Sequence, residues 1–142
     1  GAAGAGQAAK ICNNMILGIS MIGTCEAFVL AEKLGLDKQK LFDIASVSSG
    51  QSWSMTTYCP VPGPVPTSPA NRGYQAGFTA AMMLKDLRLA QSAAQSAGAP
   101  IPLGGQAAQV YSLMDAAGAG TMDFSGVIRL IRGDLKSSDA SS

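Results

Sequence analysis

One long apolar stretch near the start of the chain limits the folds open to this sequence. Residues 6–34 contain no proline, and apolar side chains recur there at the three- or four-residue spacing of a helix: Ile11, Met15, Ile19, Ile22, Cys25 and Val29. Gly35 is a natural stop, because glycine readily adopts the left-handed backbone of a helix C-cap. Such a helix would be about 43 Å long and apolar on nearly every face. The pattern predicts a long helix that forms the spine of a helical bundle.

The same stretch falls short of a membrane-spanning helix. Its uncharged portion ends at Glu26, and within residues 11–26 it contains four polar side chains, Asn13, Asn14, Ser20 and Thr24. It therefore lacks the roughly 18 consecutive apolar residues of a spanning helix. We expect a buried helix and no membrane partner.

Further helical signals follow along the chain. Asp37 can cap a helix that ends at Gly50, residues 52–58 can form a short turn, and Asp123 can cap a final helix. Helices are also expected over residues 78–97, closed by Gly98 and Pro100, and over residues 103–117. The expected core residues of these elements are Leu41, Phe42, Ile44, Val47, Met82, Leu84, Leu87, Ala90, Val110, Leu113, Met114, Val127, Ile128 and Ile131. No strand pattern is found, so we predict an all-α domain of about six helices over residues 1–136 with a disordered tail at 137–142.

The prolines between positions 60 and 69 interrupt this helical pattern. Pro60, Pro62, Pro64, Pro66 and Pro69 alternate mostly with small residues. That spacing forbids a helix and favours a stiff, extended surface segment. We interpret the segment as a connector rather than as a proline-rich ligand, because nothing in the sequence marks it as exposed. It is not a domain boundary, because helical pattern of the same kind resumes after it.

Composition excludes several classes of function. Hydrophobic residues make up 47% and charged residues 13% of the 142 residues, with 10 Lys and Arg against 9 Asp and Glu. A basic surface for nucleic acid is therefore not expected. So little charge cannot cover so much apolar helix in a monomer, and we expect a homo-oligomer.

The reactive side chains narrow the chemistry further. The chain has no histidine, which removes the usual general base and the commonest zinc ligand. Its three cysteines, Cys12, Cys25 and Cys59, lie far apart without CxxC spacing, so we expect neither a disulfide framework nor a metal site. A reducing compartment fits best. The chain starts at Gly1 rather than Met, as expected of a processed or truncated piece.

A glycine motif at the start matches the letters of a dinucleotide fingerprint. Residues 4–9 fit GxGxxG/A, and Glu26 lies roughly 20 residues beyond, where a ribose-binding acid would stand. The fingerprint needs a preceding strand and a second strand for the acid, whereas Glu26 falls inside the predicted helix. We reject it and expect Gly4 and Gly6 to form a tight start to the long helix.

Two polar groups remain as candidate sites. Lys10, Asn13 and Asn14 share one side of the long helix, where an ammonium can exchange a proton with a hydroxyl group and amides can bind a carboxylate. The alternative without a functional role is that Lys10 is simply exposed to solvent beside polar residues at the start of a helix. Lys85 and Asp86 lie in an otherwise apolar helix, either as a surface stripe or as the lining of a cleft, and periodicity does not decide between them.

The motifs together resemble those of a known family. Gly4-x-Gly6-x-x-x-Lys10-x-x-Asn13-Asn14 is similar to the corresponding helix start of the β-hydroxyacid dehydrogenases, most of all in the members that act on 3-hydroxyisobutyrate. Four further segments recur in that order, Ser48 to Trp53, Pro60 to Gly63, Tyr74 to Phe78 and Lys85 to Ala90. The resemblance covers nearly the whole chain.

The resemblance implies a fold and a set of roles. It implies a helical domain like the C-terminal domain of 6-phosphogluconate dehydrogenase, which binds substrate and forms the dimer or tetramer interface, next to an N-terminal Rossmann domain that this chain lacks. Lys10 would handle the hydroxyl proton, Asn14 with Asn13 would hold the substrate carboxylate, and Lys85 with Asp86 would contact NAD. NAD itself would be bound mainly by the missing domain, so the chain alone is expected to be inactive.

The resemblance also implies a pathway and leaves alternatives. The implied reaction oxidises 3-hydroxyisobutyrate to methylmalonate semialdehyde in valine catabolism, in the mitochondrial matrix of a eukaryote or the cytoplasm otherwise. A related enzyme that acts on tartronate semialdehyde or glyoxylate is the nearer alternative. A noncatalytic helical assembly domain is the alternative from another class.

Overall fold

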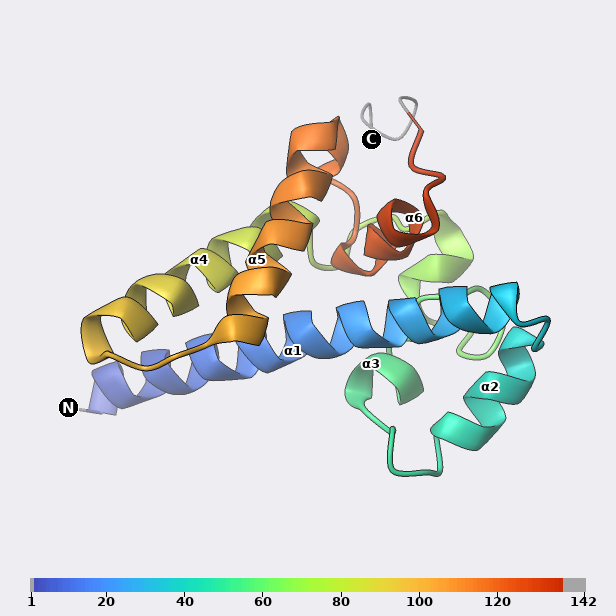
Figure 1. Ribbon diagram of the computed structural model, residues 1–142, viewed down its shortest axis with the longest axis horizontal. Helices are drawn as coiled ribbons and strands as arrows, with labels where there is room; N and C mark the ends of the chain where they lie inside the picture. Colours follow the sequence, from blue (N-terminus) through green and yellow to red (C-terminus); the bar gives the residue numbers. More distant parts are fainter. Residues whose placement is uncertain (1, 137–142) are drawn as a thin grey trace.

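The computed structural model describes residues 2–136, which form helices arranged around one long helix, α1 (Figure 1). The α-helices are α1 (Ala2–Lys33), α2 (Lys38–Ala45), α3 (Trp53–Thr56), α4 (Ala80–Ala97), α5 (Pro102–Met114) and α6 (Val127–Arg132). Shorter turns of helix are η1 (Pro69–Arg72), η2 (Asp115–Ala119) and η3 (Phe124–Gly126). Within residues 2–136 the only β pairing is an isolated bridge between Thr79 and Asp123. The prediction of an all-α fold built on one long helix is confirmed.

Helix α1 is the spine of the molecule. In Figure 1, α4, α5 and α6 lie along one side of it, and α2 and α3 lie along the other. Its second half supplies the buried side chains Met21, Cys25 and Phe28 to the core. Residues 4–33 are long and apolar enough to cross a membrane by length and composition alone, a test that core helices of soluble proteins also meet. Here α1 packs against five other helices of the same domain.

The two ends of α1 compare differently with the prediction. Its stop is confirmed, because Gly35 has a φ of 77° and the Leu36 amide donates to the Ala31 carbonyl. Its start lies earlier than expected, so Gly4 and Gly6 fall inside the helix. The role predicted for these glycines, a tight start to the helix, is therefore wrong.

The short helix α2 begins after the predicted cap, Asp37, but it buries fewer side chains than the sequence predicts. The Asp37 carboxylate accepts hydrogen bonds from the backbone amides of Gln39 and Lys40. The helix ends at Ala45 rather than at Gly50, and the side chains of Ile44 and Val47 are 60% and 83% exposed. Both were expected in the core. Val47 lies beyond the helix, and the face of α2 that packs on the core consists of Leu41, Phe42 and Ala45.

Helices α4 and α5 pack against α1 and supply further core side chains. Leu84, Leu87 and Ala90 are buried on α4 and Met114 is buried on α5, as predicted. Met82 and Leu113 are 52% and 62% exposed, and Val110 is only partly buried. Small residues lie at the helix contact instead, since a Cβ added at Gly104 would stand 2.8 Å from the Met15 sulfur. Helices that pack this closely need small residues such as glycine and alanine at their contact. Hydrophobicity alone predicted larger side chains there.

The proline segment is not the stiff, extended surface segment that its composition predicts. It bends back on itself, and its ends are buried at Pro60, Val61 and Ser68 to Ala70. One side chain closes the loop: Asn71 accepts from the Gly63 amide at 2.9 Å and donates to the Val65 carbonyl at 2.8 Å. The amide of Asn71 thus fixes a compact loop that prolines alone would leave extended.

The last helical segment begins at the predicted residue. The Asp123 carboxylate caps η3 by accepting from the Ser125 amide, and α6 follows directly with Val127 and Ile128 buried. The tail predicted at residues 137–142 lies outside the described residues.

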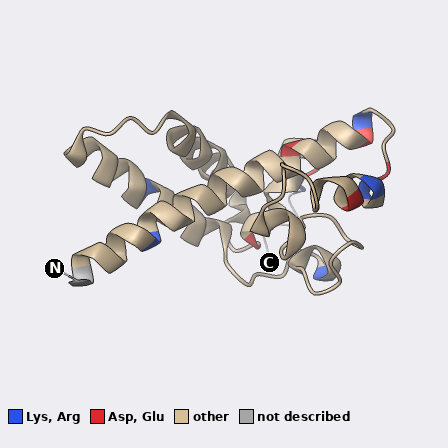
Figure 2. Ribbon diagram, turned by 90° about the horizontal axis from the view of Figure 1, so that it is seen from below, with Lys and Arg blue, Asp and Glu red and all other residues tan. Residues whose placement is uncertain are grey.

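Charged side chains are distributed unevenly over this fold. Figure 2 shows that they gather where α1 ends and α2 begins, at Glu32, Lys33, Asp37, Lys38, Lys40 and Asp43. The other half of α1 is sparsely charged and carries Lys10. Lys10 therefore stands apart from the other charged side chains, and it lines a pocket between α1 and α4.

Candidate functional site

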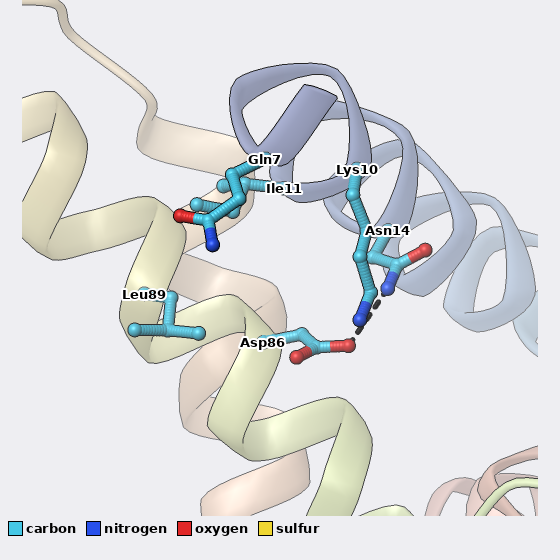
Figure 3. A pocket seen from close by; sticks show the side chains of 6 residues that line it. All are labelled: Gln7, Lys10, Ile11, Asn14, Asp86 and Leu89. Atoms are coloured by element: carbon cyan, nitrogen blue, oxygen red, sulfur yellow. Dashed lines mark hydrogen bonds between the residues drawn. The ribbon is translucent and has the colours of Figure 1, made fainter. Parts of the chain in front are cut away.

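The crossing of α1 and α4 brings the two predicted polar groups together. Asn14 on α1 donates from its side-chain Nδ2 to Oδ2 of Asp86 on α4 at 2.7 Å, across 72 positions of sequence. Lys10 stands one turn before Asn14, and Figure 3 shows both side chains extending from α1 toward Asp86. The three residues line a pocket of about 220 Å³ together with Gln7, Ile11 and Leu89.

Local sequence explains why these side chains meet. Gln7, Lys10, Ile11 and Asn14 follow the spacing that places residues on one helix face. One turn further, Gly18 lets α4 come close, because a Cβ there would stand 3.0 Å from the Met83 sulfur. The absent side chain at Gly18 therefore brings α4 within hydrogen-bonding reach of α1.

The pocket offers mixed chemistry. Ile11 and Leu89 provide an apolar part, whereas Lys10, Asn14 and Asp86 provide an ammonium, an amide and a carboxylate. The Lys10 side chain is exposed, and Asp86 is partly buried. Such a set can bind a small polar anion and exchange a proton with it through the lysine.

Asn13 faces a different hollow from Asn14. It contacts Asn14 through a long hydrogen bond of 3.4 Å from its Nδ2 to the neighbouring Oδ1. Its side chain lines a second hollow of about 510 Å³ with Ile16, Leu17, Ser20, Ser52 and Trp53. The structure therefore separates the two asparagines that the sequence grouped, and only Asn14 lies in the pocket with Lys10.

The pair Lys85 and Asp86 is also divided by the helix. Asp86 faces the pocket, while Lys85 is exposed and is not among the pocket's lining residues. Neighbouring helical positions point about 100° apart, and at this point of α4 only the Asp86 direction falls on the pocket. The carboxylate is the lining residue, and the lysine lies on the solvated face.

Two lining features escaped sequence reasoning. Gln7 precedes Lys10 by three positions and Asn14 by seven, so the helical spacing itself could have identified it. Trp53 had no such signal, because its place beside α1 depends on α3 and on its stacking against Tyr58 at 4.9 Å between ring centres. Burial, together with a hydrogen bond to Asp123, raises the pKa of Tyr58 above its ordinary value.

The glycine motif does not form a phosphate-binding turn. Gly4 and Gly6 lie within α1, and a Cβ added at either would meet nothing within 4 Å. A dinucleotide cradle needs glycines where backbone approaches phosphate closely. The glycine motif therefore supplies no binding turn for the phosphates of a cofactor. No group of three or more His, Cys, Asp and Glu side chains able to hold a metal is found among these residues.

Comparisons with known proteins agree with this arrangement. A family model described as "NAD-binding of NADP-dependent 3-hydroxyisobutyrate dehydrogenase" matches residues 4–131. A probable 3-hydroxyisobutyrate dehydrogenase of Mycobacterium tuberculosis is 55% identical over 132 residues, which cover 93% of this chain and 45% of that protein. The human mitochondrial 3-hydroxyisobutyrate dehydrogenase is 52% identical over 132 residues, or 93% of this chain and 39% of that protein.

A solved structure shows the same helical arrangement. The Mycobacterium tuberculosis 3-hydroxyisobutyrate dehydrogenase with L-serine superposes with a TM-score of 0.87 at 54% identity, over 91% of this chain and 44% of that one. The chain spans less than half the length of these relatives. Because the family model matches residues 4–131, which is most of the chain, the chain belongs to the family described as "NAD-binding of NADP-dependent 3-hydroxyisobutyrate dehydrogenase".

Proposed function

We propose that this chain is the C-terminal, substrate-binding and dimerisation domain of an NAD-dependent dehydrogenase that oxidises 3-hydroxyisobutyrate to methylmalonate semialdehyde. The observation that carries the proposal is the convergence of Lys10, Asn14 and Asp86 in one pocket of a chain whose relatives bear that enzyme's name. The pocket, at about 220 Å³, is smaller than the roughly 300–1,000 Å³ typical of sites for drug-sized ligands. A short hydroxyacid is the class of substrate that suits it.

Each polar side chain has a proposed task. Nζ of Lys10 takes the proton of the substrate hydroxyl group as the carbonyl forms. Asn14 donates an N–H to a carboxylate oxygen of the substrate, with Asn13 supporting it from the adjacent position of α1. Ile11 and Leu89 provide the apolar part of the pocket, which suits the carbon skeleton of the acid.

The cofactor is proposed to meet this chain at α4. When bound, NAD supplies the acceptor for the substrate's hydride. Lys85 and Asp86 are the proposed contacts from this chain, and a preceding Rossmann domain would hold the phosphates that Gly4 and Gly6 do not hold. Since Lys10 is exposed here, the same domain would also cover the pocket and exclude water during proton transfer.

The assembly and location of the whole protein follow the same proposal. Several large apolar side chains are exposed on the described surface, among them Ile16, Leu30, Leu34 and Leu113. Their burial between copies favours a dimer or tetramer. Eukaryotic relatives are named mitochondrial, so we propose the mitochondrial matrix in a eukaryote and the cytoplasm otherwise, with a role in valine breakdown.

Steady-state kinetics test the proposed reaction. The full-length protein that contains this chain is assayed for NAD-dependent oxidation of 3-hydroxyisobutyrate, as wild type and as Lys10→Ala. Removal of a general base lowers rates by about 10²- to 10⁴-fold, so we expect at least a hundredfold loss of kcat. Lys40→Ala is the matched control, because Lys40 is exposed on α2 away from the pocket.

The outcome also separates the alternatives. A loss below tenfold in Lys10→Ala would exclude the proton-transfer role. Turnover of glycerate or glycolate in preference to 3-hydroxyisobutyrate would assign a related hydroxyacid enzyme. Absence of turnover with every short hydroxyacid would leave the assembly domain as the better description.

A further inference from the structure

We propose that Asp86 is a positioning residue that acts on the substrate through Asn14. The inference rests on the proposed function and deepens it, since it assigns the α4 carboxylate to the substrate side of the pocket as well as to the cofactor side. The structural basis is the 2.7 Å hydrogen bond from Asn14 Nδ2 to Asp86 Oδ2.

This hydrogen bond fixes which end of the Asn14 amide faces α4. A carboxylate only accepts hydrogen bonds, so a flipped amide would place Oδ1 of Asn14 against an anion. The partly buried setting of the bond strengthens this preference, because charge-assisted bonds gain in a lower dielectric. Asp86 therefore holds Nδ2 on the pocket side of the side chain.

The fixed amide has one N–H left for a ligand. An amide nitrogen carries two hydrogens, and Asp86 takes one of them. At the other end of the group, Oδ1 is within 3.4 Å of the Asn13 nitrogen. The second hydrogen on Nδ2 is thus the donor that Asn14 offers to a substrate oxygen, in the pocket that Lys10 also lines.

The surroundings support a positioning role for this carboxylate. Asp86 lies on a helix whose Leu84 and Leu87 are buried on its other faces, and α4 is held close to α1 at Gly18. Its backbone is therefore anchored by packing that does not involve the pocket. A side chain carried on such a rigid element can orient a neighbour within the small tolerance that catalysis requires.

A double-mutant cycle on the full-length protein tests the inference. The variants are Asp86→Leu, Asn14→Leu and the double variant, with kcat/KM for 3-hydroxyisobutyrate at saturating NAD as the readout, so that a weakened cofactor contact does not enter the comparison. Loss of a hydrogen bond to a charged group should lower kcat/KM by about ten- to a hundredfold in Asp86→Leu. If Asp86 acts through Asn14, the double variant should match Asn14→Leu within about twofold.

The conservative variant and a control sharpen the test. Asp86→Asn keeps an oxygen that can accept from Nδ2, so we expect it to recover most of the kcat/KM lost in Asp86→Leu. Asp43 also accepts from a side-chain amide, that of Gln39 at 2.9 Å, but on the exposed face of α2. Asp43→Leu should leave the kinetics unchanged. Where Asp86→Leu does not fold, Asp86→Ser replaces it in the cycle.

The results distinguish failure of the positioning role from failure of the proposed function. Losses that multiply in the double variant, or an Asp86→Asn as poor as Asp86→Leu, would overturn the positioning role while the wild-type activity stands. A wild type that turns over no short hydroxyacid would overturn the proposed function, and the inference with it.

Discussion

At the residue scale, the Asp123 carboxylate accepts several buried hydrogen bonds away from the pocket. It is fully buried, and its Oδ1 accepts from the Tyr58 hydroxyl at 2.7 Å and from the backbone amides of Gly77 and Phe78 at 2.9 and 3.1 Å. Oδ2 accepts from the amide of Ser125 at 3.0 Å. This single carboxylate joins three segments that are far apart in sequence.

Replacement of Asp123 should therefore be strongly destabilising. Asp123→Ala would leave several buried donors without an acceptor, at about 1–3 kcal/mol each. We expect the free energy of unfolding to fall by more than about 3 kcal/mol, measured by urea titration. Asp123→Asn keeps one acceptor oxygen and should lose less. A loss for Asp123→Ala no larger than that of the exposed Asp43→Ala would contradict this account.

Buried tyrosines should make the fold sensitive to alkaline pH. Burial raises the pKa of Tyr74 from 10.0 to about 12, and it raises the pKa of Tyr111 too. The stability they contribute is complete below the unfolded pKa and is lost as pH rises through the folded one. We expect the free energy of unfolding to decline between pH 10 and about 12.

Tyr74→Phe isolates one of these contributions. The variant loses the hydrogen bond from the Tyr74 hydroxyl to the Pro60 carbonyl at 2.6 Å, so it should be less stable at neutral pH by about 1 kcal/mol. Its stability should then fall less steeply above pH 10. Urea titrations at fixed pH values measure both effects, and parallel pH curves for the two proteins would contradict the assignment.

Site residues were predictable from sequence only up to a point. Helical spacing alone grouped Lys10 with Asn14, and the structure places both on one face of the pocket. The choice between Lys85 and Asp86 as the lining residue could not be made, because it depends on how α4 rotates against α1. That rotation is set by contacts at Gly18 and Met83, which are distant in sequence.

At the element scale, helix ends were more predictable than buried faces. Local chemistry determines ends, as the cap at Asp37 and the stops at Gly35 and Gly98 show. Which face of a helix is buried depends on the helices packed against it. Where apolar residues occur on several faces, their periodicity does not identify the buried one. For this reason Met82 and Leu113 were expected in the core and lie exposed.

Two glycines offer a matched test of helix structure. Gly98 closes α4 with a φ of 70° in open space, so Gly98→Ala should lower stability by about 1–2 kcal/mol through backbone strain alone. Gly105 lies within α5, where a Cβ would meet only the Gln91 side chain at 3.6 Å. Gly105→Ala should raise stability by about 0.5–1 kcal/mol.

Thermal unfolding measures the two changes side by side. Equal shifts in Tm for the two variants would contradict the assignment of Gly98 to the left-handed C-cap position. Gly105→Ala thus serves as the control for the general effect of adding a methyl group.

At the scale of the whole molecule, the pocket is open and one-sided. Lys10 is exposed, and the glycine motif forms no turn for dinucleotide phosphates, since Gly4 and Gly6 lie inside α1. Composition and spacing predicted the helical architecture, whereas the expectation of a second domain came from the family resemblance. The spacing of apolar residues within these helices gives no information about a separate domain.

We therefore expect the 142-residue chain to show no NAD-dependent turnover of 3-hydroxyisobutyrate by itself. The assay follows NADH absorbance with the purified chain at high concentration, beside the full-length protein. Saturable turnover by the chain alone, in a preparation free of full-length enzyme, would contradict the expectation.

The length of α1 has a mechanical consequence. Its anchors Met21, Cys25 and Phe28 are buried in the second half of the helix, while Lys10 stands on the other half, about 12 Å beyond Gly18. Over that arm, a tilt of about 5° moves the lysine by about 1 Å, a displacement that can lower an enzymatic rate by about a hundredfold. We therefore expect that a cavity opened beneath Phe28 would tilt α1 and displace Lys10 from its position in the pocket.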